Sequence, residues 1–205
     1  MKKGMSLFLY LTIISIFIST FFCSTAFAAS FKDLSNSHWA YKYIISLTNS
    51  NVINGYTDGT FKPEGTITKA EFIKLVISAA LPDWVDMDDA ESNINHWAGK
   101  YVWIAERYGV ISNGSINSNN IDSPITRIEM VRIISRADLT MKGNSLATNE
   151  KVKFNDVLSL NNDDLLLLKH AVSRGLITGY TDNTFKPNNN MSRAEAATMI
   201  YRFKN

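Results

Sequence analysis

The chain carries one block of roughly 60 residues three times over, and this internal repeat limits the possible folds more than any other feature. In each copy an Ile ends an apolar stretch, and a hydroxyl residue 15 positions later opens the next one: Ile53 and Thr68, Ile111 and Thr126, Ile177 and Ser192. A unit this short cannot bury its apolar face by itself. The three copies must therefore pack against one another, and we expect binding sites at the seams between them.

The loop inside the repeat is almost identical in the first and third copies. Residues 54–63 read Asn-Gly-Tyr-Thr-Asp-Gly-Thr-Phe-Lys-Pro, and residues 178–187 read Thr-Gly-Tyr-Thr-Asp-Asn-Thr-Phe-Lys-Pro. The second copy departs from this pattern, with Asn-Gly-Ser-Ile at 113–116 in place of Gly-Tyr-Thr-Asp. A groove walled by the second loop is therefore doubtful, and we expect one or two competent grooves rather than three.

The N-terminus has the pattern of a cleaved signal peptide. Lys2 and Lys3 precede an almost continuous apolar run over 7–22, and a small-x-small triplet, Ala-Phe-Ala, ends at residue 28. The alternative is a retained membrane anchor, because the run is long enough to span a bilayer. The cleavage triplet favours removal of residues 1–28, after which no membrane contact is expected.

Removal of residues 1–28 would leave a chain with no net charge. It takes away two of the 21 Lys and Arg residues and none of the 19 Asp and Glu residues, so 19 of each sign remain. Nucleic acid is therefore not an expected partner, and any anion binding must come from local placement of charge. The single cysteine, Cys23, leaves with the same segment, so no disulfide is expected.

Each copy is predicted to form a helix, a loop and a second helix, which gives an all-α fold. An aromatic-x-Asp opener begins each copy, in Phe31-Lys32-Asp33, Trp84-Val85-Asp86 and Phe154-Asn155-Asp156. The first helices show apolar residues at helical spacing and end near Asn51, Gly109 and Gly175. The predicted organisation is a signal peptide (1–28), a first repeat (29–83), a second repeat with the degenerate loop (84–142), a linker (143–151) and a third repeat (152–205).

The second helices begin with a strong start signal of the form Ser/Thr-x-x-Glu. It occurs as Thr68 to Glu71, Thr126 to Glu129 and Ser192 to Glu195. In such a capping box the hydroxyl accepts from the backbone N–H three residues on, and the Glu side chain accepts from the N–H of the cap residue. Directly after the cap residue stands a cation in every copy: Lys69, Arg127 and Arg193.

These motifs together resemble the surface-layer homology family. The resemblance rests on the opener, the His-Trp-Ala start of the first helix at 38–40 and 96–98, the Gly-Tyr-x-Asp loop and the capped second helix. It covers the three repeats and implies a pseudo-threefold bundle with ligand grooves between neighbouring modules. It also implies a secreted protein of the cell wall or surface layer of a Gram-positive bacterium, bound non-covalently to secondary cell-wall polysaccharide that is often pyruvylated.

Physical chemistry supplies a reason for such a ligand. A helix N-terminus carries unsatisfied N–H groups and a partial positive charge, so it favours an anion, and a cation placed there adds a charge-assisted donor for the carboxylate of a pyruvate ketal. Aromatic rings can stack on sugar faces, and loop carboxylates can accept from sugar hydroxyls. The predicted ligand-binding residues are Lys69, Arg127, Arg193, Glu71, Glu129, Glu195, Asp58, Asp182, Tyr56, Tyr180, Trp39 and Trp97.

Structural roles are the alternative for many of these residues. The three Glu residues are fully explained by the capping boxes. Trp39 and Trp97 fall on the apolar face of their helices, which favours the core, and Asp58 and Asp182 fit Asx-turns equally well. Gly55 and Gly179 are expected at turn positions with positive φ, and the loop residues Phe61 and Phe185 are expected to anchor the loop in the core.

The predicted function is non-catalytic anchoring to anionic wall polysaccharide. The alternative is a protein–protein assembly module of the surface layer with little glycan binding, which the degenerate second loop favours. A wall hydrolase is a third hypothesis, but no cysteine remains for catalysis and no Ser lies in a nucleophile elbow. Asp86, Asp88 and Asp89 lack the Gly of a calcium loop. No enzyme activity, cofactor or metal site is therefore expected.

Overall fold

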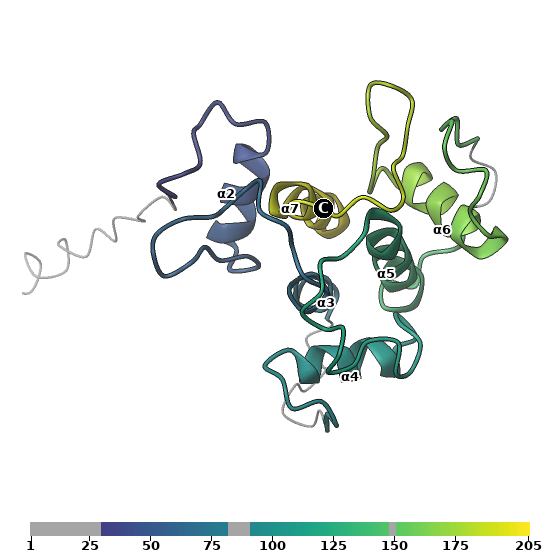
Figure 1. Ribbon diagram of the computed structural model, residues 1–205, viewed down its shortest axis with the longest axis horizontal. Coiled ribbons are helices and arrows are strands. Elements are labelled where there is room, and N and C mark those ends of the chain that lie inside the picture. Colours follow the sequence, from purple (N-terminus) through teal and green to yellow (C-terminus); the bar gives the residue numbers. More distant parts are fainter. Residues whose placement is uncertain (1–29, 82–90, 148–150) are drawn as a thin grey trace, which may run out of the picture.

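The computed structural model describes residues 30–81, 91–147 and 151–205 (Figure 1). Within these ranges the chain forms helices and no strands, which confirms the all-α prediction. The helices are α2 (Tyr41–Asn49), α3 (Lys69–Ala80), α4 (Gly99–Arg107), α5 (Arg127–Thr140), α6 (Asn162–Ser173) and α7 (Arg193–Lys204). None of these helices is long and apolar enough to cross a membrane. The expected signal peptide, the opener at 84–86 and the acidic run after it lie outside the described residues.

The outer helix of each repeat packs on an inner helix that belongs to a different repeat. Outer helix α4 lies on α3, α6 lies on α5, and α2 lies on α7, so that three arms radiate from the centre (Figure 1). The inner helices also meet, because α3 contacts both α5 and α7. The pairing of α2 with α7 joins the first and last helices, with the rings of Tyr43 and Tyr201 centred 5.0 Å apart. The three repeats therefore form one closed bundle.

A cyclic set of backbone hydrogen bonds marks the centre of this bundle. Ile67 N–H donates to the carbonyl of Met191 (3.1 Å), Met191 to Ile125 (3.1 Å), and Ile125 back to Ile67 (3.0 Å). All three side chains are buried. Each residue immediately precedes the cap residue of an inner helix, so one contact repeated three times fixes the relative positions of α3, α5 and α7. This ring of contacts gives the fold its pseudo-threefold arrangement.

All three predicted capping boxes are present. The cap hydroxyls accept from the N–H of Glu71 (3.2 Å), Glu129 (3.4 Å) and Glu195 (3.2 Å), and each Glu accepts from the N–H of its cap residue. The first two N–H groups of each inner helix are also occupied, because they donate to carbonyls in the loop of the neighbouring repeat. The expectation that these helix N-termini offer free N–H groups to an anion is therefore wrong. Only side chains remain to bind one.

The aromatic-x-Asp opener holds the loop of its own repeat. Both carboxylate oxygens of Asp33 accept backbone N–H groups, from Phe61 and Lys62, each at 2.8 Å. Burial works to raise the pKa of Asp33, but these two bonds outweigh it and hold the pKa below its ordinary value. Asp156 makes the same pair of bonds in the third repeat. The motif therefore has a structural role that the sequence pattern did not reveal.

The loop aromatics occupy the positions expected, whereas the loop glycines act differently from the prediction. Phe61 and Phe185 are fully buried, as predicted. Gly55 and Gly179 do not have positive φ. They are required instead because a Cβ at Gly55 would lie 2.3 Å from the ring of Phe31, and one at Gly179 would lie 2.1 Å from the ring of Phe154. Positive φ occurs where the outer helices end, at Asn51, Gly109 and Gly175.

The start of the predicted linker is held in place by a buried polar cluster between α5 and α6. The carboxylate of Asp138 accepts from Nε2 of His170 (3.0 Å), from Arg174 (3.1 Å) and from Asn144 (3.0 Å). The other ring nitrogen of His170 accepts the backbone N–H of Ala147 (3.2 Å). His170 and Asp138 are 0% and 1% exposed. These contacts fasten residues 144–147 to the helix pair.

Candidate functional site

Each seam of the bundle contains a groove, and each groove takes its walls from more than one repeat. We number the grooves after the repeat that supplies the loop. Groove I, of about 210 Å³, includes Asn54, Tyr56, Glu71, Lys74, Trp97 and Arg193. Groove II, of about 280 Å³, includes Lys69, Ser112, Ser115, Glu129, Arg132 and Arg136. Groove III, of about 270 Å³, includes Trp39, Arg127, Thr178, Tyr180, Glu195 and Arg202.

The three predicted cations line these grooves, and each one is paired with the capping Glu of a neighbouring repeat. Nζ of Lys69 lies 2.7 Å from Glu129, Nη1 of Arg127 lies 3.4 Å from Glu195, and Nη1 of Arg193 lies 2.9 Å from Glu71. Each Glu uses one oxygen, Oε2, to cap its own helix and the other, Oε1, to bind the cation. The pairs form a closed ring of ionic contacts around the bundle. Sequence reasoning had found both partners but not their pairing, because they are far apart in the chain.

Both arginines are buried and stacked against aromatic rings. The guanidinium of Arg193 lies 4.7 Å from the ring centre of Tyr56 and 4.9 Å from that of Phe61. Arg127 lies 4.6 Å from Tyr180 and 5.1 Å from Phe185. Such cation–π contacts are strongest where water is excluded. These contacts hold each guanidinium beside the aromatic residues of its groove.

The hydrogen bonds of the two arginines differ. In groove I, Nε of Arg193 donates to the Phe61 carbonyl (2.9 Å), and Nη2 donates to the Asn54 carbonyl (3.3 Å). In groove III, Nη2 of Arg127 donates to the Thr178 carbonyl (2.5 Å), but its buried Nε has no partner among the described residues. Burial lowers the pKa of Arg127, while nearby Glu195 acts in the opposite direction. The side chain nevertheless remains a cation at neutral pH.

The two tyrosines of the loops bind the same glutamates. The Tyr180 hydroxyl donates to Oε1 of Glu195 (2.9 Å), and the Tyr56 hydroxyl lies 3.5 Å from Oε1 of Glu71. Burial is the main cause of the raised pKa of each tyrosine. Both hydroxyls therefore stay protonated at neutral pH and remain hydrogen-bond donors. Cation, carboxylate and tyrosine form one connected cluster in grooves I and III.

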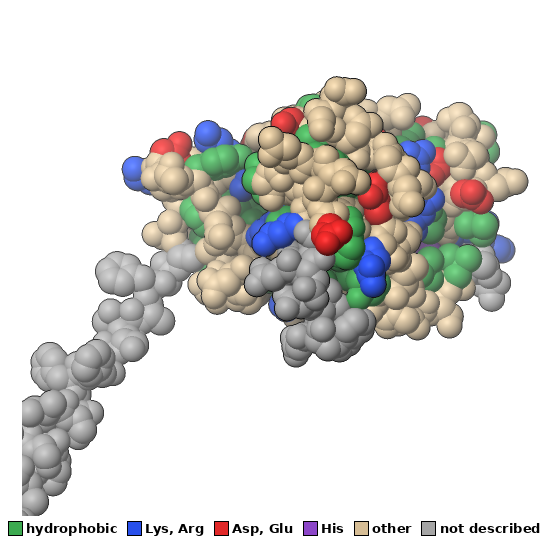
Figure 2. Space-filling model, turned by 90° about the horizontal axis from the view of Figure 1, so that it is seen from below, with side chains coloured by type: hydrophobic (Ala, Val, Ile, Leu, Met, Phe, Trp, Pro, Cys, Tyr) green, Lys and Arg blue, Asp and Glu red, His purple; other side chains and the backbone are tan. Residues whose placement is uncertain are grey.

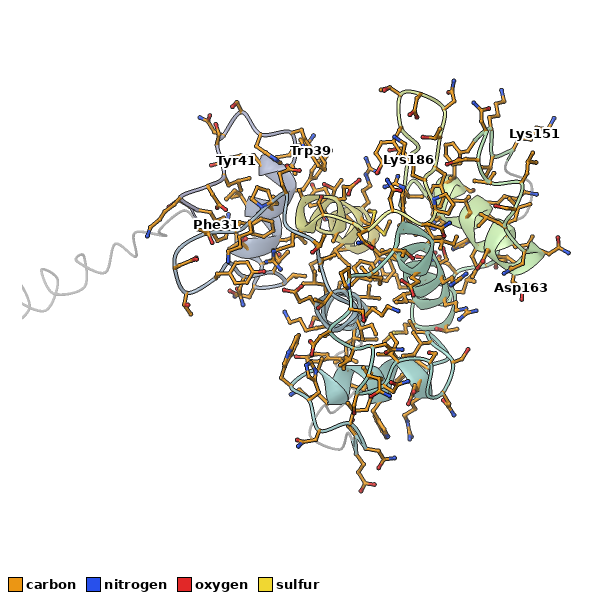
Figure 3. The ribbon with its side chains drawn as sticks, viewed as in Figure 1. Phe31, Trp39, Tyr41, Lys151, Asp163 and Lys186 are labelled. Atoms are coloured by element: carbon orange, nitrogen blue, oxygen red, sulfur yellow. The ribbon has the colours of Figure 1, made fainter. Side chains whose placement is uncertain are left out.

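Trp39 and Trp97 are exposed, so the interpretation of these residues as core is wrong. Their exposed fractions are 55% and 57%. Trp39 lies at the start of α2 on the side toward the third repeat and lines groove III (Figure 3), and Trp97 lines groove I. The helical periodicity was misleading because both residues precede the first turn of their helices.

The histidine beside each tryptophan explains how the ring is positioned. Nδ1 of His38 accepts the N–H of Ala40 (3.1 Å), while its Nε2 donates to Glu64 (3.0 Å). His96 repeats both contacts with Ala98 (3.2 Å) and Asp122 (3.2 Å). The histidine therefore ties the start of the outer helix to the loop before an inner helix. The His-Trp-Ala motif presents its tryptophan on a constrained backbone.

The loop carboxylates Asp58 and Asp182 close their own loops. Oδ1 of each accepts the N–H and the hydroxyl of the Thr two residues later, Thr60 or Thr184. These bonds hold the pKa of both carboxyls below the ordinary value. The Asx-turn alternative is thus present in the structure, and neither residue lines the three grooves. Their contact with a ligand stays a prediction.

Groove II differs from the other two grooves in both aromatic positions. Gly114 stands where the other loops have Tyr, and Asp163, at the start of α6, stands where the other outer helices have Trp (Figure 3). The cation is Lys69, which lacks the planar fork of an arginine. Basic and acidic side chains are interspersed on the face shown in Figure 2. The charges near a ligand in a groove are therefore those of the residues that line that groove.

A family model described as "S-layer homology domain" matches residues 30–73 and 169–197, which lie in the first and third repeats. Among curated relatives, an endoglucanase of Bacillus sp. (strain KSM-635) is 26% identical over 97% of this chain and 22% of its own length. S-layer protein EA1 of Bacillus anthracis is 28% identical over 83% of this chain and 20% of its own. A cellulosome-anchoring protein of Acetivibrio thermocellus is 33% identical over 53% of this chain and 26% of its own.

The chain thus spans about a quarter or less of the length of these relatives. The relative named endoglucanase is a much longer protein, and the match covers 22% of it. The matched motifs are those that build the bundle and line its grooves. By its repeated motifs, its all-helical pseudo-threefold bundle and these matches, the chain belongs to the S-layer homology family.

Proposed function

We propose that this protein anchors to the bacterial cell wall by binding an anionic, pyruvylated secondary wall polysaccharide in grooves I and III. The family and the surface-layer relatives support a secreted, cell-wall-associated protein of a Gram-positive bacterium. The name of the cellulosome-anchoring relative also supports an anchoring role. No catalytic step is part of the proposal.

One observation carries the choice of grooves I and III. In each of them an exposed tryptophan, a loop tyrosine and a buried arginine converge, and each of the three comes from a different repeat. Groove I combines Tyr56 of the first repeat, Trp97 of the second and Arg193 of the third. An indole can stack on the apolar face of a sugar, while a guanidinium can donate to its carboxylate.

The geometry also sets a condition on the ligand. Each arginine already donates to a glutamate, so a ligand carboxylate must use the remaining N–H groups at the edge of the guanidinium, beside Glu71 or Glu195. Such a ligand binds near a carboxylate, and the two negative charges repel. Affinity must therefore depend on sugar stacking as well as on charge. Substitution of the tryptophans is therefore a sharper test of ligand binding than substitution of the arginines.

The test is a pull-down of the protein with purified cell walls, before and after acid extraction of the secondary polymer. Trp39→Ala and Trp97→Ala should each reduce binding about tenfold, because each removes the aromatic surface that stacks on a sugar in its groove, and the double variant should abolish binding. Trp103→Ala, outside the three grooves defined above, is the matched control. Unchanged binding by the double variant, or equal binding to extracted walls, would reject the proposal.

Assembly with other surface-layer proteins is the second candidate function. It is favoured by groove II, which lacks both aromatic residues, and by relatives that are themselves S-layer proteins. In that case binding to intact surface layers would survive acid extraction of the polysaccharide. The same pull-down therefore separates the two functions.

A further inference from the structure

Groove II is lined by a different set of side chains from grooves I and III: it has more cations and no aromatic residue. Its lining contains three cations, Lys69, Arg132 and Arg136, and one carboxylate, Glu129. Grooves I and III each contain two cations and one carboxylate among the lining residues given above. Compared with grooves I and III, groove II has no aromatic wall and has one more cation in its lining, although Arg132 is paired with Asp164 behind it. This change points to a different ligand class.

The cations of groove II come from two helices and are held in place. Lys69 begins α3 and is fixed by Glu129 at 2.7 Å. Arg132 on α5 donates through Nε and Nη2 to the buried carboxylate of Asp164, at 2.5 and 2.7 Å, which leaves its Nη1 without a hydrogen bond among the described residues. Arg136 lies one turn further along α5 and has no carboxylate partner in the described part of the chain. A compact anion between them would meet donors from both helices.

The rest of the lining limits the size and polarity of the ligand. Ser112 and Ser115 contribute hydroxyls to the lining, of which that of Ser115 already donates to the Ser112 carbonyl (2.6 Å). Buried apolar residues form the floor: Val110, Ile111, Ile116 and Ile133. No ring is present among the lining residues to stack on a sugar. A tetrahedral phosphate presents several oxygens to several donors at once, and arginine binds it with two parallel hydrogen bonds. A short polyol chain carries hydroxyls for the serines and a carbon backbone for the floor.

We propose that groove II binds a phosphate group, carried by a short polyol chain, through Arg132, Arg136 and Lys69. This site goes beyond the proposed function and does not rest on it, because it shares no lining residue with grooves I and III. The phosphate could belong to a polyol-phosphate polymer or be free in solution. The experiment distinguishes these two sources.

The test is isothermal titration of the protein with inorganic phosphate, glycerol phosphate and a short poly(glycerol phosphate), with glycerol as the uncharged control. Arg136→Gln should weaken phosphate binding about tenfold, because it removes one charge-assisted contact. Arg202→Gln is the matched control, because Arg202 occupies the same position on α7 and lines groove III. It should leave phosphate binding unchanged.

The outcomes separate the proposals. Tighter binding of the polyol phosphates than of inorganic phosphate supports the site and identifies a polymer as its source, whereas equal binding supports a phosphate site and contradicts the contribution of the polyol chain. Absence of saturable binding, or equal losses in Arg136→Gln and Arg202→Gln, overturns the site. Trp39→Ala and Trp97→Ala, which test wall binding, should bind glycerol phosphate like the parent, so failure of one proposal leaves the other standing.

Discussion

At the scale of single residues, one side chain often performs two tasks in this protein. Glu71, Glu129 and Glu195 each cap a helix with one oxygen and bind a cation from another repeat with the other. Sequence analysis found the capping task because its partners lie three residues apart. The second task joins residues 60 or more positions apart, and only the packed structure reveals it.

We predict that Arg193→Gln lowers the free energy of unfolding by about 3 kcal/mol, because it breaks a largely buried ion pair and leaves the carboxylate of Glu71 without its partner. Arg193→Lys should cost less, since it keeps the charge and loses the planar stack on Tyr56. Urea unfolding followed by circular dichroism measures both. Equal stability of parent and Arg193→Gln would show that the ionic ring does not stabilise the bundle.

The loop glycines allow a second prediction. Gly179→Ala should destabilise the protein by about 2 kcal/mol, since the new Cβ would lie 2.1 Å from the ring of Phe154 and force it to move. Gly109→Ala should cost less, about 1 kcal/mol, because its positive φ is the only obstacle and no atom lies within 4 Å. A thermal melt of the two variants ranks them, and the reverse order would contradict the steric account.

At the scale of elements, charged contacts join α5 of the second repeat to α6 of the third. Among the described residues, no ion pair joins α2 to α7 in the same way. The bidentate pair of Arg132 and Asp164 links α5 to α6, and Asp138 with His170 continues the contact further along both helices. The hydrogen bond from Arg132 is the main cause of the lowered pKa of Asp164. A carboxyl whose pKa is lower in the folded state stabilises the fold above its unfolded pKa of about 3.9, and this stabilisation is lost as pH falls through the folded value.

The resulting prediction concerns acid stability. The parent should lose stability as the pH falls from about 5 to 2, and Asp164→Asn should be less stable at pH 7 while losing less on acidification. Urea midpoints measured at intervals between pH 2 and 7 test this. Asp163→Asn, which changes an exposed acid on the same turn, is the control and should follow the parent. Parallel curves for Asp164→Asn and the parent would refute the assignment.

At the scale of the whole molecule, the repeats exchange helices in a closed order. Each outer helix covers an inner helix of another repeat, and α2 returns to cover α7. Every groove of the proposed wall-binding pair likewise draws on all three repeats. A single repeat therefore contains neither a covered core nor a complete groove.

Removal of one repeat should consequently disrupt the remaining two. A chain without residues 152–205 leaves the faces of α2 and α5 uncovered, and we expect it to lose its near-ultraviolet circular dichroism and its single cooperative unfolding transition. The intact protein should unfold in one step. A truncated chain that unfolds cooperatively with near-parental stability would show that the repeats are independent domains.

The sequence by itself determined everything that depends on near neighbours. The helices, their three capping boxes, their breaker residues and the repeat itself follow from spacings of a few residues, because capping and helical periodicity are local properties. The cation after each cap was predicted from the sequence to bind a ligand, and the structure places it in a groove between repeats. The degenerate loop correctly indicated that one groove would differ.

Only the tertiary structure decided which helix covers which and how the charges pair. For Trp39 and Trp97 the sequence favoured the core over ligand contact, for Gly55 and Gly179 it predicted positive φ, and for the inner helices it predicted free N–H groups, and the structure shows none of these three features. The N–H groups of the inner helices donate to loops of a neighbouring repeat, and the tryptophans line grooves shared between repeats. Each glycine instead packs against the opener ring of its own repeat, 24 or 25 residues earlier in the chain. Contacts between segments that are distant in the chain leave no trace in local spacing, so only the folded structure reveals them.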